Sequence, residues 1–470
     1  MALPSPACGD FPTPPDLVTA VLRCLQVRGD RWPRVLEPTC GTGNFIRGLL
    51  ALTDPPREIW AIEANTDYVD QVQYLAQQSV QTQIWVRQAH LFDVPLQHLP
   101  WQTSGPLLVM GNPPWVTNAR LGSLGSANLP AKRNLRRLRG IDALTGASNF
   151  DLAEAVWCKL IEDLLEQCPT IALLCKTAVA RRILQIAWER QWPIGNGAIH
   201  TIEARRWFGA AVGACLFHLE ITSATPCYEV GLYPDLEIDC PTSRLSLAGK
   251  KLIANATLYQ QFSFLEGRSG IIWRQGVKHD AAPVMELTQK GPGRFQNQLG
   301  ETVDIEPAYL YPLLKSSDLF RDRSGSQRAV IVTQTRLGQD TAHLEKEAPR
   351  LWRYLQHHQA FFARRKSSLY QNKPAFSMFG VGDYTFSPYK VAIAGFYAEP
   401  RFRLLTSVHD RPMLLDDTCY FLPCHSLDQA QQIQAFLSSP PCLGFIQAQV
   451  FPDAKRPITK KLLQSIQLPD

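Results

Sequence analysis

The sequence predicts an α/β chain in which a mostly parallel, doubly wound sheet is followed by an α+β domain. Over residues 1–230, short β-rich runs alternate with amphipathic stretches, the order that produces βαβ units. This pattern stops in a Pro- and Asp-rich stretch at 227–241, which indicates a boundary. Beyond it, short strands are separated by many Gly and Pro breaks. We therefore expect one domain over residues 1–230 and a second over 240–470.

The elements of the first domain follow from their periodicity. Runs of four to nine apolar and β-branched residues indicate buried strands, and stretches with a 3.6-residue apolar period indicate helices. The second domain contains one clear helical pattern, at 346–366. The strands are expected at 34–38, 58–64, 83–89, 106–112, 170–176 and 213–221, and the helices at 17–27, 67–78, 151–167 and 178–191.

Composition restricts the class of protein. Of 470 residues, 45% are hydrophobic and 19% are charged, as in ordinary soluble globular proteins. No apolar run approaches the ~20 residues of a membrane helix, and the first residues do not resemble a secretion signal. The 12 cysteines include no CxxC pair, which disfavours a zinc ribbon or a disulfide framework. We expect a cytoplasmic protein with no membrane attachment.

The net charge of +6 is unevenly distributed, since the excess of basic residues falls in the second half. Basic clusters are usually solvated surface, but DNA or RNA rewards clustered Lys and Arg through counterion release. Nucleic acid is therefore the first partner to consider. The candidate phosphate-binding residues are Arg133, Arg136 and Arg137 in the first half, and Arg364, Arg365 and Lys366 in the second.

A glycine turn after the first predicted strand is the first candidate site. Gly41 and Gly43 allow the backbone to approach a ligand closely, and Glu37 at the strand end can hold an ammonium group. Many such turns only connect two elements. There is no GxGxxG and no GxxxxGK[ST] pattern, which disfavours a cradle for pyrophosphate or triphosphate.

A second acid, Glu63, ends the next predicted strand. An acid at this position, about 20 residues after a glycine turn, commonly binds ribose hydroxyls. By itself it could be an exposed residue at a strand end. Together with Glu37 and the glycines it predicts a nucleoside that also carries an ammonium group. S-adenosylmethionine fits this description, whereas NAD does not.

The most specific motif is Asn112-Pro113-Pro114-Trp115, at the end of the fourth predicted strand. Ligands of open α/β sheets bind at this edge, and the two prolines restrict the backbone. The Asn112 side-chain oxygen and the Pro113 carbonyl oxygen can both accept, which suits the two hydrogens of an NH2 group. Accepting both would draw a conjugated amine towards tetrahedral geometry and release its lone pair for attack on a methyl group. Trp115 offers a face on which a base can stack. This chemistry requires no metal.

With these motifs the chain resembles the gamma class of adenine-N6 DNA methyltransferases. The resemblance implies a Rossmann-like class I methyltransferase domain over 1–230 and a target-recognition domain over 240–470. It also implies that S-adenosylmethionine supplies the methyl group to an adenine flipped out of duplex DNA. The residues that match the catalytic motif are Asn112, Pro113, Pro114 and Trp115, and those that match cofactor motifs are Thr13, Glu37, Pro38, Gly41, Gly43, Glu63 and Asp93.

Three further assignments come only from the resemblance. His90 stands where the family has an Asp near the cofactor adenine, so either Asp93 takes that role after a shift of register or the contact is a different one. Phe208, an ordinary core residue by itself, matches an aromatic that stacks on the flipped base opposite Trp115. The segments 270–280, 314–318, 379–390 and 453–459 resemble recurring parts of the recognition domain.

The resemblance also implies a place in a restriction-modification or defence system, whose other subunits are candidate partners. Two alternatives stay open. Asn-Pro-Pro-aromatic motifs also serve enzymes that methylate RNA bases or protein amides. The chain could also be a DNA-binding subunit that keeps the fold without turnover, a hypothesis favoured only by His90.

Overall fold

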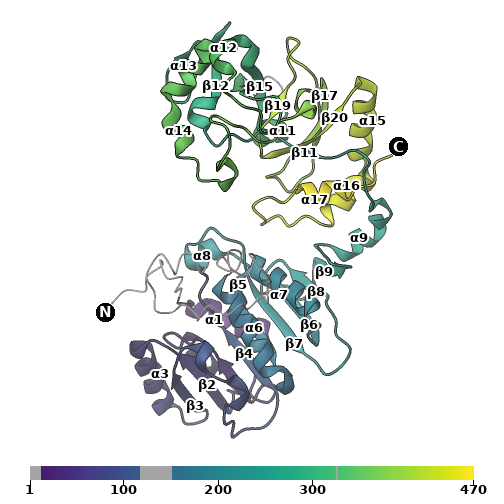
Figure 1. Cartoon of the computed structure of the whole chain (residues 1–470). Helices are drawn as coiled ribbons and strands as arrows, with labels where there is room; N and C mark the ends of the chain where they lie inside the picture. Colours follow the sequence, from purple (N-terminus) through teal and green to yellow (C-terminus); the bar gives the residue numbers. More distant parts are fainter. Residues whose placement is uncertain (1–11, 117–150, 324–326, 470) are drawn as a thin grey trace. The chain divides into compact units, whose positions relative to one another are not determined.

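The computed structural model describes residues 12–116, 151–323 and 327–469 (Figure 1). The chain divides into two compact units, Met1–Ala256 and Thr257–Asp470. The predicted phosphate-binding residues Arg133, Arg136 and Arg137 lie outside the described residues. Within the described ranges, no helix combines the length and apolar character needed to cross a bilayer.

The first unit is built on a ten-stranded sheet, with strand order β10-β9-β8-β6-β7-β5-β4-β1-β2-β3 among the described residues. The pairs β1–β2, β1–β4, β2–β3 and β4–β5 are parallel, and β7 is antiparallel to both of its neighbours. The strands are β1 (Arg34–Glu37), β2 (Glu58–Glu63), β3 (Gln83–Gln88), β4 (Leu107–Gly111), β5 (Thr170–Lys176), β6 (Ile194–Ile202), β7 (Ala214–Ile221), β8 (Val230–Tyr233), β9 (Ser243–Ala248) and β10 (Lys251–Ile253).

Helices cover both faces of this sheet. Residues of α1, α2 and α3 share one hydrophobic cluster with Met110 and Leu216 of the strands. Phe217 points to the opposite face, where it lies 4.7 Å from Trp157 of α6 between ring centroids. The sheet is therefore doubly wound, as predicted. The helices are α1 (Pro15–Cys24), α2 (Asn44–Leu50), α3 (Thr66–Gln78), α6 (Leu152–Leu164), α7 (Thr177–Glu189) and α8 (Ala204–Phe208), with short 3-10 turns at Leu91–Asp93, Leu96–His98 and Leu165–Gln167.

The sheet continues beyond the predicted domain boundary. Strands β8, β9 and β10 extend it to Ile253, so the division between the compact units falls after Ala256, later than the 230–240 region. Strand β6 was not predicted, because its sequence contains glycines and polar residues. A Cβ on Gly197 would lie 2.5 Å from a Leu219 side-chain carbon, so glycine is needed for close strand packing there.

In its described residues, the second unit is α+β and contains two sheets. One has the order β14-β13-β12-β16-β15-β19 and the other the order β11-β20-β17-β18. Their strands are β11 (Arg274–Gln275), β12 (Glu286–Gly291), β13 (Arg294–Gln296), β14 (Thr302–Val303), β15 (Leu310–Leu314), β16 (Arg328–Ile331), β17 (Tyr389–Ala394), β18 (Phe402–Leu405), β19 (Leu414–Leu415) and β20 (Cys419–Cys424).

The prediction of one continuous helix at 346–366 is wrong. Three short helices, α12 (Leu344–Glu347), α13 (Pro349–His357) and α14 (Gln359–Ala363), occupy this region. Pro349 has no backbone N–H and starts α13, so the preceding turn cannot continue through it. The other helices of the unit are α10 (Ala282–Met285), α11 (Ser316–Phe320), α15 (Leu427–Leu437), α16 (Pro440–Gln447) and α17 (Lys460–Gln464), and α9 (Ala256–Phe262) begins at the division between the units.

Candidate functional site

The site lies where the strand order reverses. Strands β1 and β4 are parallel neighbours, and the next strands along the chain lie on opposite sides of this pair. Ligands of open α/β sheets bind at such a point, beyond the carboxyl ends of the strands. Glu37 ends β1 and Gly111 ends β4. A Cβ on Gly111 would lie 3.6 Å from Cγ of Glu37, so the two strand ends are in contact.

The glycine turn adopts the backbone that its residues allow. Gly41 and Gly43 have φ angles of 50° and 80°, in the left-handed region that favours glycine. A Cβ on Gly43 would lie 3.0 Å from a Val72 methyl group of α3, so the turn packs tightly on that helix. A Cβ on Gly41 would meet no atom within 4 Å. The turn therefore borders open space on the Gly41 side.

Glu63 closes this turn from the neighbouring strand. Its Oε2 accepts a hydrogen bond of 2.9 Å from the Gly41 backbone N–H. Its Oε1 accepts from the N–H groups of Ala64 and Asn65, each at 2.9 Å. A carboxylate offers about four lone-pair positions, so one position remains for a further donor. Glu63 thus joins the ends of β1 and β2 and can still bind a hydroxyl.

Glu37 is buried, with 2% of its surface exposed, and its Oε2 has no hydrogen-bond partner among the described residues. Burial, and after it the negative charge of Glu63, raises the pKa of the Glu37 carboxyl well above its ordinary value. A buried carboxylate without a partner is unfavourable, and an ammonium group would relieve this cost. The residues present therefore fit a ligand with an ammonium group beside the Gly41 turn, as S-adenosylmethionine has.

Thr13 holds the Asn112 side chain in one orientation. Asn112 Nδ2 donates a hydrogen bond of 3.2 Å to Thr13 Oγ1, and Asn44 Nδ2 donates one of 2.8 Å to the Thr13 backbone oxygen. Thr13 is itself buried, with 5% exposure. Because Nδ2 faces Thr13, Oδ1 is the end of the amide that can accept. Thr13 therefore contacts Asn112 in this structure, and its contact with a cofactor stays a prediction.

Trp115 is buried just beyond the carboxyl end of β4, a central strand of the sheet. It is 6% exposed, and its indole N–H donates a 3.2 Å hydrogen bond to the Leu174 backbone oxygen. The Phe208 ring packs edge-on against it, with centroids 5.0 Å apart and planes at 71°. The structure therefore brings the two predicted stacking residues together. A base could enter between them only if the rings moved apart.

Asp151 and Lys176, of which the sequence did not single out the lysine, support the Asn-Pro-Pro-Trp turn. Lys176, the last residue of β5, donates a 3.0 Å hydrogen bond from Nζ to the Trp115 backbone oxygen. The same Nζ lies 2.6 Å from Asp151 Oδ2, and Asp151 Oδ1 accepts from the Ala153 N–H at the start of α6. A lysine at the carboxyl end of a central strand was the available signal.

The third predicted cofactor segment contains His90 and Asp93. Asp93 is exposed in a short 3-10 turn, and His90 is half-buried with its ring 5.8 Å from Phe92. Phe92 in turn packs against Val116 and Leu152. The segment therefore lies beside the residue that follows Trp115. Pro38, Pro113 and Pro114 occupy the two strand-end turns, with Pro38 and Pro113 buried.

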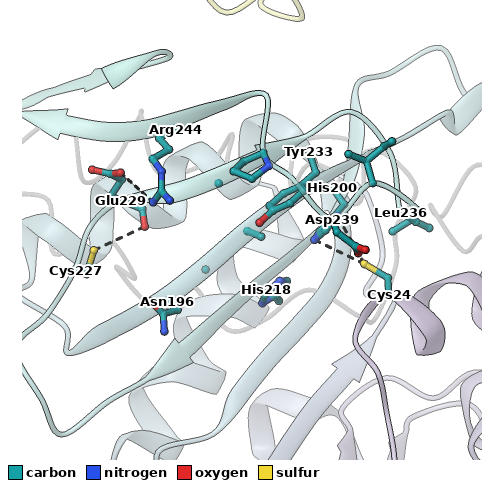
Figure 2. A pocket seen from close by; sticks show the side chains of 15 residues that line it. Cys24, Asn196, His200, His218, Cys227, Glu229, Tyr233, Leu236, Asp239 and Arg244 are labelled. Carbon is teal, nitrogen blue, oxygen red and sulfur yellow. Dashed lines mark hydrogen bonds and ion pairs between the residues drawn. The ribbon is translucent and has the colours of Figure 1, made fainter. Parts of the chain in front are cut away.

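A separate pocket of about 400 Å³ lies on strands β6, β7 and β8 (Figure 2). In it, Cys24 Sγ lies 3.6 Å from His200 Nδ1, and His200 stacks on Tyr233 with ring centroids 4.3 Å apart. Burial raises the pKa of Cys24 to about 11 and lowers the pKa of His218 to about 4. These shifts favour a neutral thiol and a neutral imidazole, so the pocket does not present an activated nucleophile. None of the predicted site residues lines it.

The basic cluster of the second unit is only partly available to a partner. Arg364 and Lys366 are exposed. The Arg365 guanidinium donates to the Ser377 backbone oxygen at 2.7 Å and lies 3.7 Å from the Tyr370 ring centroid. Arg365 therefore stabilises its own domain, and Arg364 and Lys366 are the members of the cluster that can contact phosphates.

Comparison with known proteins gave no matching family model. The chain is 37% identical over 462 residues to a Type II methyltransferase, M.NspV, of Nostoc sp. (strain ATCC 29411 / PCC 7524), covering 98% of this chain and 96% of that protein. Among solved structures, it superposes on the Type IIL restriction-modification enzyme MmeI in complex with DNA with a TM-score of 0.50 and 12% identity. That match covers 87% of this chain and 59% of the MmeI chain.

A further match is a putative class I S-adenosylmethionine-dependent methyltransferase from Listeria monocytogenes. It has a TM-score of 0.32 and 12% identity, and it covers 48% of this chain and 67% of that one. At these identities the likeness to solved structures concerns the fold alone. The family of this chain is instead indicated by the near full-length similarity to the Nostoc protein.

Proposed function

Because the chain belongs to the family of Type II methyltransferases, we propose that it transfers a methyl group from S-adenosylmethionine to N6 of an adenine in duplex DNA. The observation that carries this proposal is the held Asn112 amide directly after Gly111, whose strand end contacts the buried Glu37, together with the unpartnered Oε2 of Glu37. These groups meet at the reversal point of a doubly wound sheet, where a nucleoside cofactor and an amine can be held side by side.

The cofactor, when bound, supplies a methyl group on a positively charged sulfur. In the proposed complex, Glu37 accepts the ammonium group of the cofactor, and its carboxylate becomes paired. The remaining lone-pair position of Glu63 accepts a ribose hydroxyl. The turn at Gly41 allows close approach because no side chain projects into that space.

The target amine is held by two acceptors. Asn112 Oδ1 and the Pro113 backbone oxygen each accept one N–H of the adenine N6 group, which draws the nitrogen towards tetrahedral geometry. Thr13 holds the amide so that an oxygen, and not the NH2 group, is presented. Positioning of this kind contributes to catalysis because the groups need not reorganise during reaction. The nitrogen is positively charged once its bond to the methyl carbon has formed, and it then loses one proton to solvent.

Base entry requires a local rearrangement. The adenine leaves the duplex and stacks on Trp115, while the Phe208 ring moves from its present edge-on contact to the other face of the base. Phe208 ends the short helix α8 and is followed by Gly209, with φ of 65°. A single-turn helix that ends at a glycine can shift at lower cost than the central strand that anchors Trp115.

DNA is the proposed substrate because the second unit gives the chain a large surface beyond the methyltransferase domain. Its exposed Arg364 and Lys366 can bind phosphates, as expected of a target-recognition domain. We further propose that the protein acts in a restriction-modification system. Methylation of an RNA base or a protein amide would use the same acceptors and is an outcome of the test below.

The test uses radiolabelled cofactor with duplex DNA, RNA or protein, followed by chromatography of the nucleosides released from the product. We expect label in DNA as N6-methyladenine. Asn112→Ala should reduce the rate by at least about 100-fold, the loss seen when one preorganised group is removed from an active site. Asn196→Ala, a change at an exposed asparagine on β6, is the matched control and should keep full activity. Equal activity of wild type and Asn112→Ala would overturn the proposed mechanism.

A further inference from the structure

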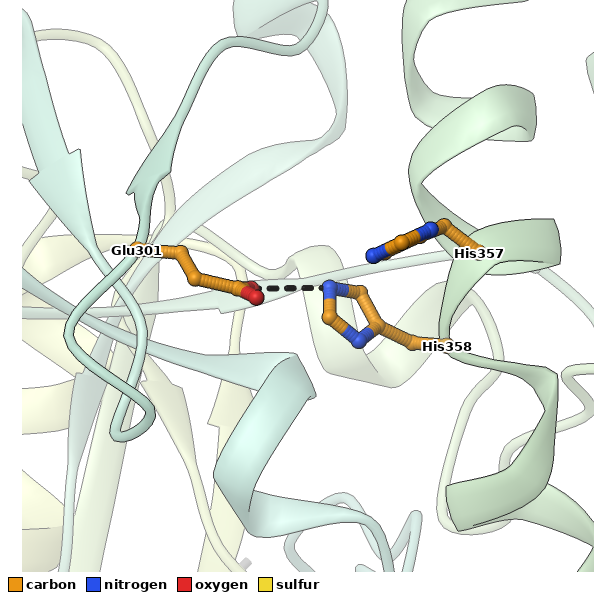
Figure 3. Close-up of side chains that lie close together, drawn as sticks. All are labelled: Glu301, His357 and His358. Atoms are coloured by element: carbon orange, nitrogen blue, oxygen red, sulfur yellow. Dashed lines mark ion pairs between the residues drawn. The ribbon is translucent and has the colours of Figure 1, made fainter.

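A group of three potential metal ligands lies in the second unit, in its β14-β13-β12-β16-β15-β19 sheet and the helices that pack on it. Glu301, His357 and His358 each offer one ligand atom, and these atoms all lie within 4.8 Å of one another (Figure 3). We propose that these three side chains bind a zinc ion that joins the β13–β14 turn to the end of α13.

The elements bring these residues together from separate parts of the chain. Glu301 lies in the turn between β13 and β14, directly before Thr302. His357 is the last residue of α13, and His358 follows it at the break before α14. Figure 3 shows the Glu301 side chain extending from the turn towards the His358 ring. The His357 ring lies beside the His358 ring and also extends towards Glu301.

The distances allow a metal to enter with small side-chain movements. His358 Nε2 lies 2.9 Å from Glu301 Oε2. Zn–N and Zn–O bonds of about 2.0–2.2 Å in tetrahedral geometry place ligand atoms about 3.3 Å apart. His357 and Glu301 are exposed and can move inwards, while His358 is buried and fixed.

A neighbouring network orients the carboxylate, as in many metal sites. Asn297 Nδ2 donates to Glu301 Oε2 at 2.7 Å and to the Tyr354 hydroxyl at 3.0 Å. Asn297 Oδ1 accepts from the backbone N–H groups of Leu299 and Glu301, each at 3.0 Å. Asn297 is 5% exposed. The turn thus presents Glu301 from a rigid support.

A second imidazole lies beside the Glu301–His358 pair. Zinc would bind Nε2 of His358 in the neutral tautomer that carries its proton on Nδ1, and the Glu301 carboxylate would then contact the ion instead of the ring N–H. A simple ion pair between Glu301 and His358 would give no role to the adjacent imidazole of His357, whose ring centroid lies 4.8 Å from that of His358.

The ligand chemistry favours zinc over harder cations. Two imidazoles and one carboxylate form a set typical of Zn²⁺, with water at the fourth position, whereas Mg²⁺ and Ca²⁺ prefer oxygen ligands. The ion would link the β13–β14 turn to the end of α13, the two elements that carry its ligands. The start of α13 is already held by Arg350, whose guanidinium lies 2.7 Å from Asp304 and 3.4 Å from Glu306. Zinc would hold the other end of the same helix.

The experiment uses the full-length chain, purified without a histidine tag and treated with a chelator. Calorimetric titration with Zn²⁺ should give one equivalent per chain, and Co²⁺ should give the visible absorption of a tetrahedral site. We expect His357→Ala to weaken binding by at least about 10-fold. His425→Ala, at an exposed histidine on another part of this unit, is the matched control and should bind as wild type.

A stability measurement separates loss of the site from loss of folding. Because His357 is exposed, His357→Ala should keep the wild-type circular dichroism spectrum and the wild-type Tm without metal. Zn²⁺ at about 100 times its Kd should raise the Tm of wild type by about 5 °C and leave that of His357→Ala unchanged. Absence of binding by wild type, or equal binding and equal Tm shifts in the two proteins, would overturn the proposal.

Discussion

Two regions of the same sheet both contain buried titratable groups, but they differ in how those groups are satisfied. At the junction of β1 and β4, Oε2 of the buried Glu37 carboxyl has no hydrogen-bond partner among the described residues. In the pocket on β6, β7 and β8, Cys24 contacts His200, and His200 Nδ1 lies 3.1 Å from the Asp235 backbone oxygen. One region holds a buried carboxyl group that an ammonium ligand could pair with, and the other holds neutral groups that contact each other.

This difference indicates that a defined cavity is a weaker sign of function than a buried carboxyl group with an unpartnered oxygen. A buried polar group without a partner costs free energy, so it is retained where something else binds it. A second buried acid of the same domain, Glu58, differs from Glu37 because its carboxylate has hydrogen-bond partners. It accepts hydrogen bonds from the Gln102 and Thr103 N–H groups and from two tryptophan rings, and it is a structural residue.

The largest expected effect comes from Glu37→Gln. The amide cannot pair with an ammonium group as a carboxylate does, so S-adenosylmethionine affinity should fall by about 100-fold, as when a charged hydrogen bond is lost. Without cofactor the variant should be more stable than wild type, because the buried charge is removed. Calorimetry would measure the binding and thermal unfolding the stability.

The pH dependence of stability tests the same residue. Because the pKa of Glu37 is raised in the folded state above its ordinary value of 4.5, the folded state binds the extra proton. Its stabilising contribution is complete below pH 4.5 and is lost as the pH rises towards the raised pKa. The Tm difference between Glu37→Gln and wild type should therefore grow with pH. Glu58→Gln is the matched control and should lower the stability of the folded protein. A Glu37→Gln protein that is less stable than wild type at every pH would contradict the inference that Glu37 lacks a partner.

A smaller effect is expected from Lys176→Met, which keeps the length of the side chain and removes its charge. The Trp115 backbone oxygen and Asp151 would each lose a partner, so the catalytic turn would be less well positioned. We expect kcat to fall by about 10-fold, with the KM for S-adenosylmethionine nearly unchanged, because the contacts of Lys176 are with Asp151 and with Trp115 of the turn proposed to hold the target base.

Lys159→Met provides the control for this change. Lys159 pairs with Asp163 at 2.7 Å within α6, and both side chains are about as buried as those of Lys176 and Asp151. It should affect stability but not kcat. If the two variants reduce kcat equally, the Lys176 contacts have no specific role in positioning the turn.

The parts of the molecule that could be predicted from sequence are those set by local pattern. The apolar runs at 34–38 and 106–112 appear as β1 and β4, and the predicted Rossmann-like domain followed by another domain is confirmed. These strands are buried on both faces, so nearly every residue is apolar and the pattern is strong. The motifs at their ends were visible because Gly and Pro restrict the backbone in recognisable ways.

The remaining features depend on contacts between distant residues. Nothing in the sequence relates Asn112 to Thr13, which is 99 positions away, or Lys176 to Trp115, which is 61 positions away. Strand β6 was missed because Gly197 serves close strand packing instead of a turn. The group of Glu301, His357 and His358 was missed because the histidines stood inside an expected continuous helix, where they read as surface residues.

The smallest effect is expected in the pocket on β6, β7 and β8. Cys24→Ser should change methyl transfer less than two-fold, since the thiol is separate from the β1–β4 junction. With its pKa near 11, Cys24 should also react with iodoacetamide at pH 8 about 100-fold more slowly than an ordinary exposed thiol, because the thiolate is the reactive form. Mass spectrometry can compare its alkylation with that of exposed Cys168 in the same sample. Rapid alkylation of Cys24 would contradict the proposed difference between the two regions, because the pocket would then hold a reactive thiol. Loss of activity in Cys24→Ser would contradict it as well, because the pocket would then contribute to methyl transfer.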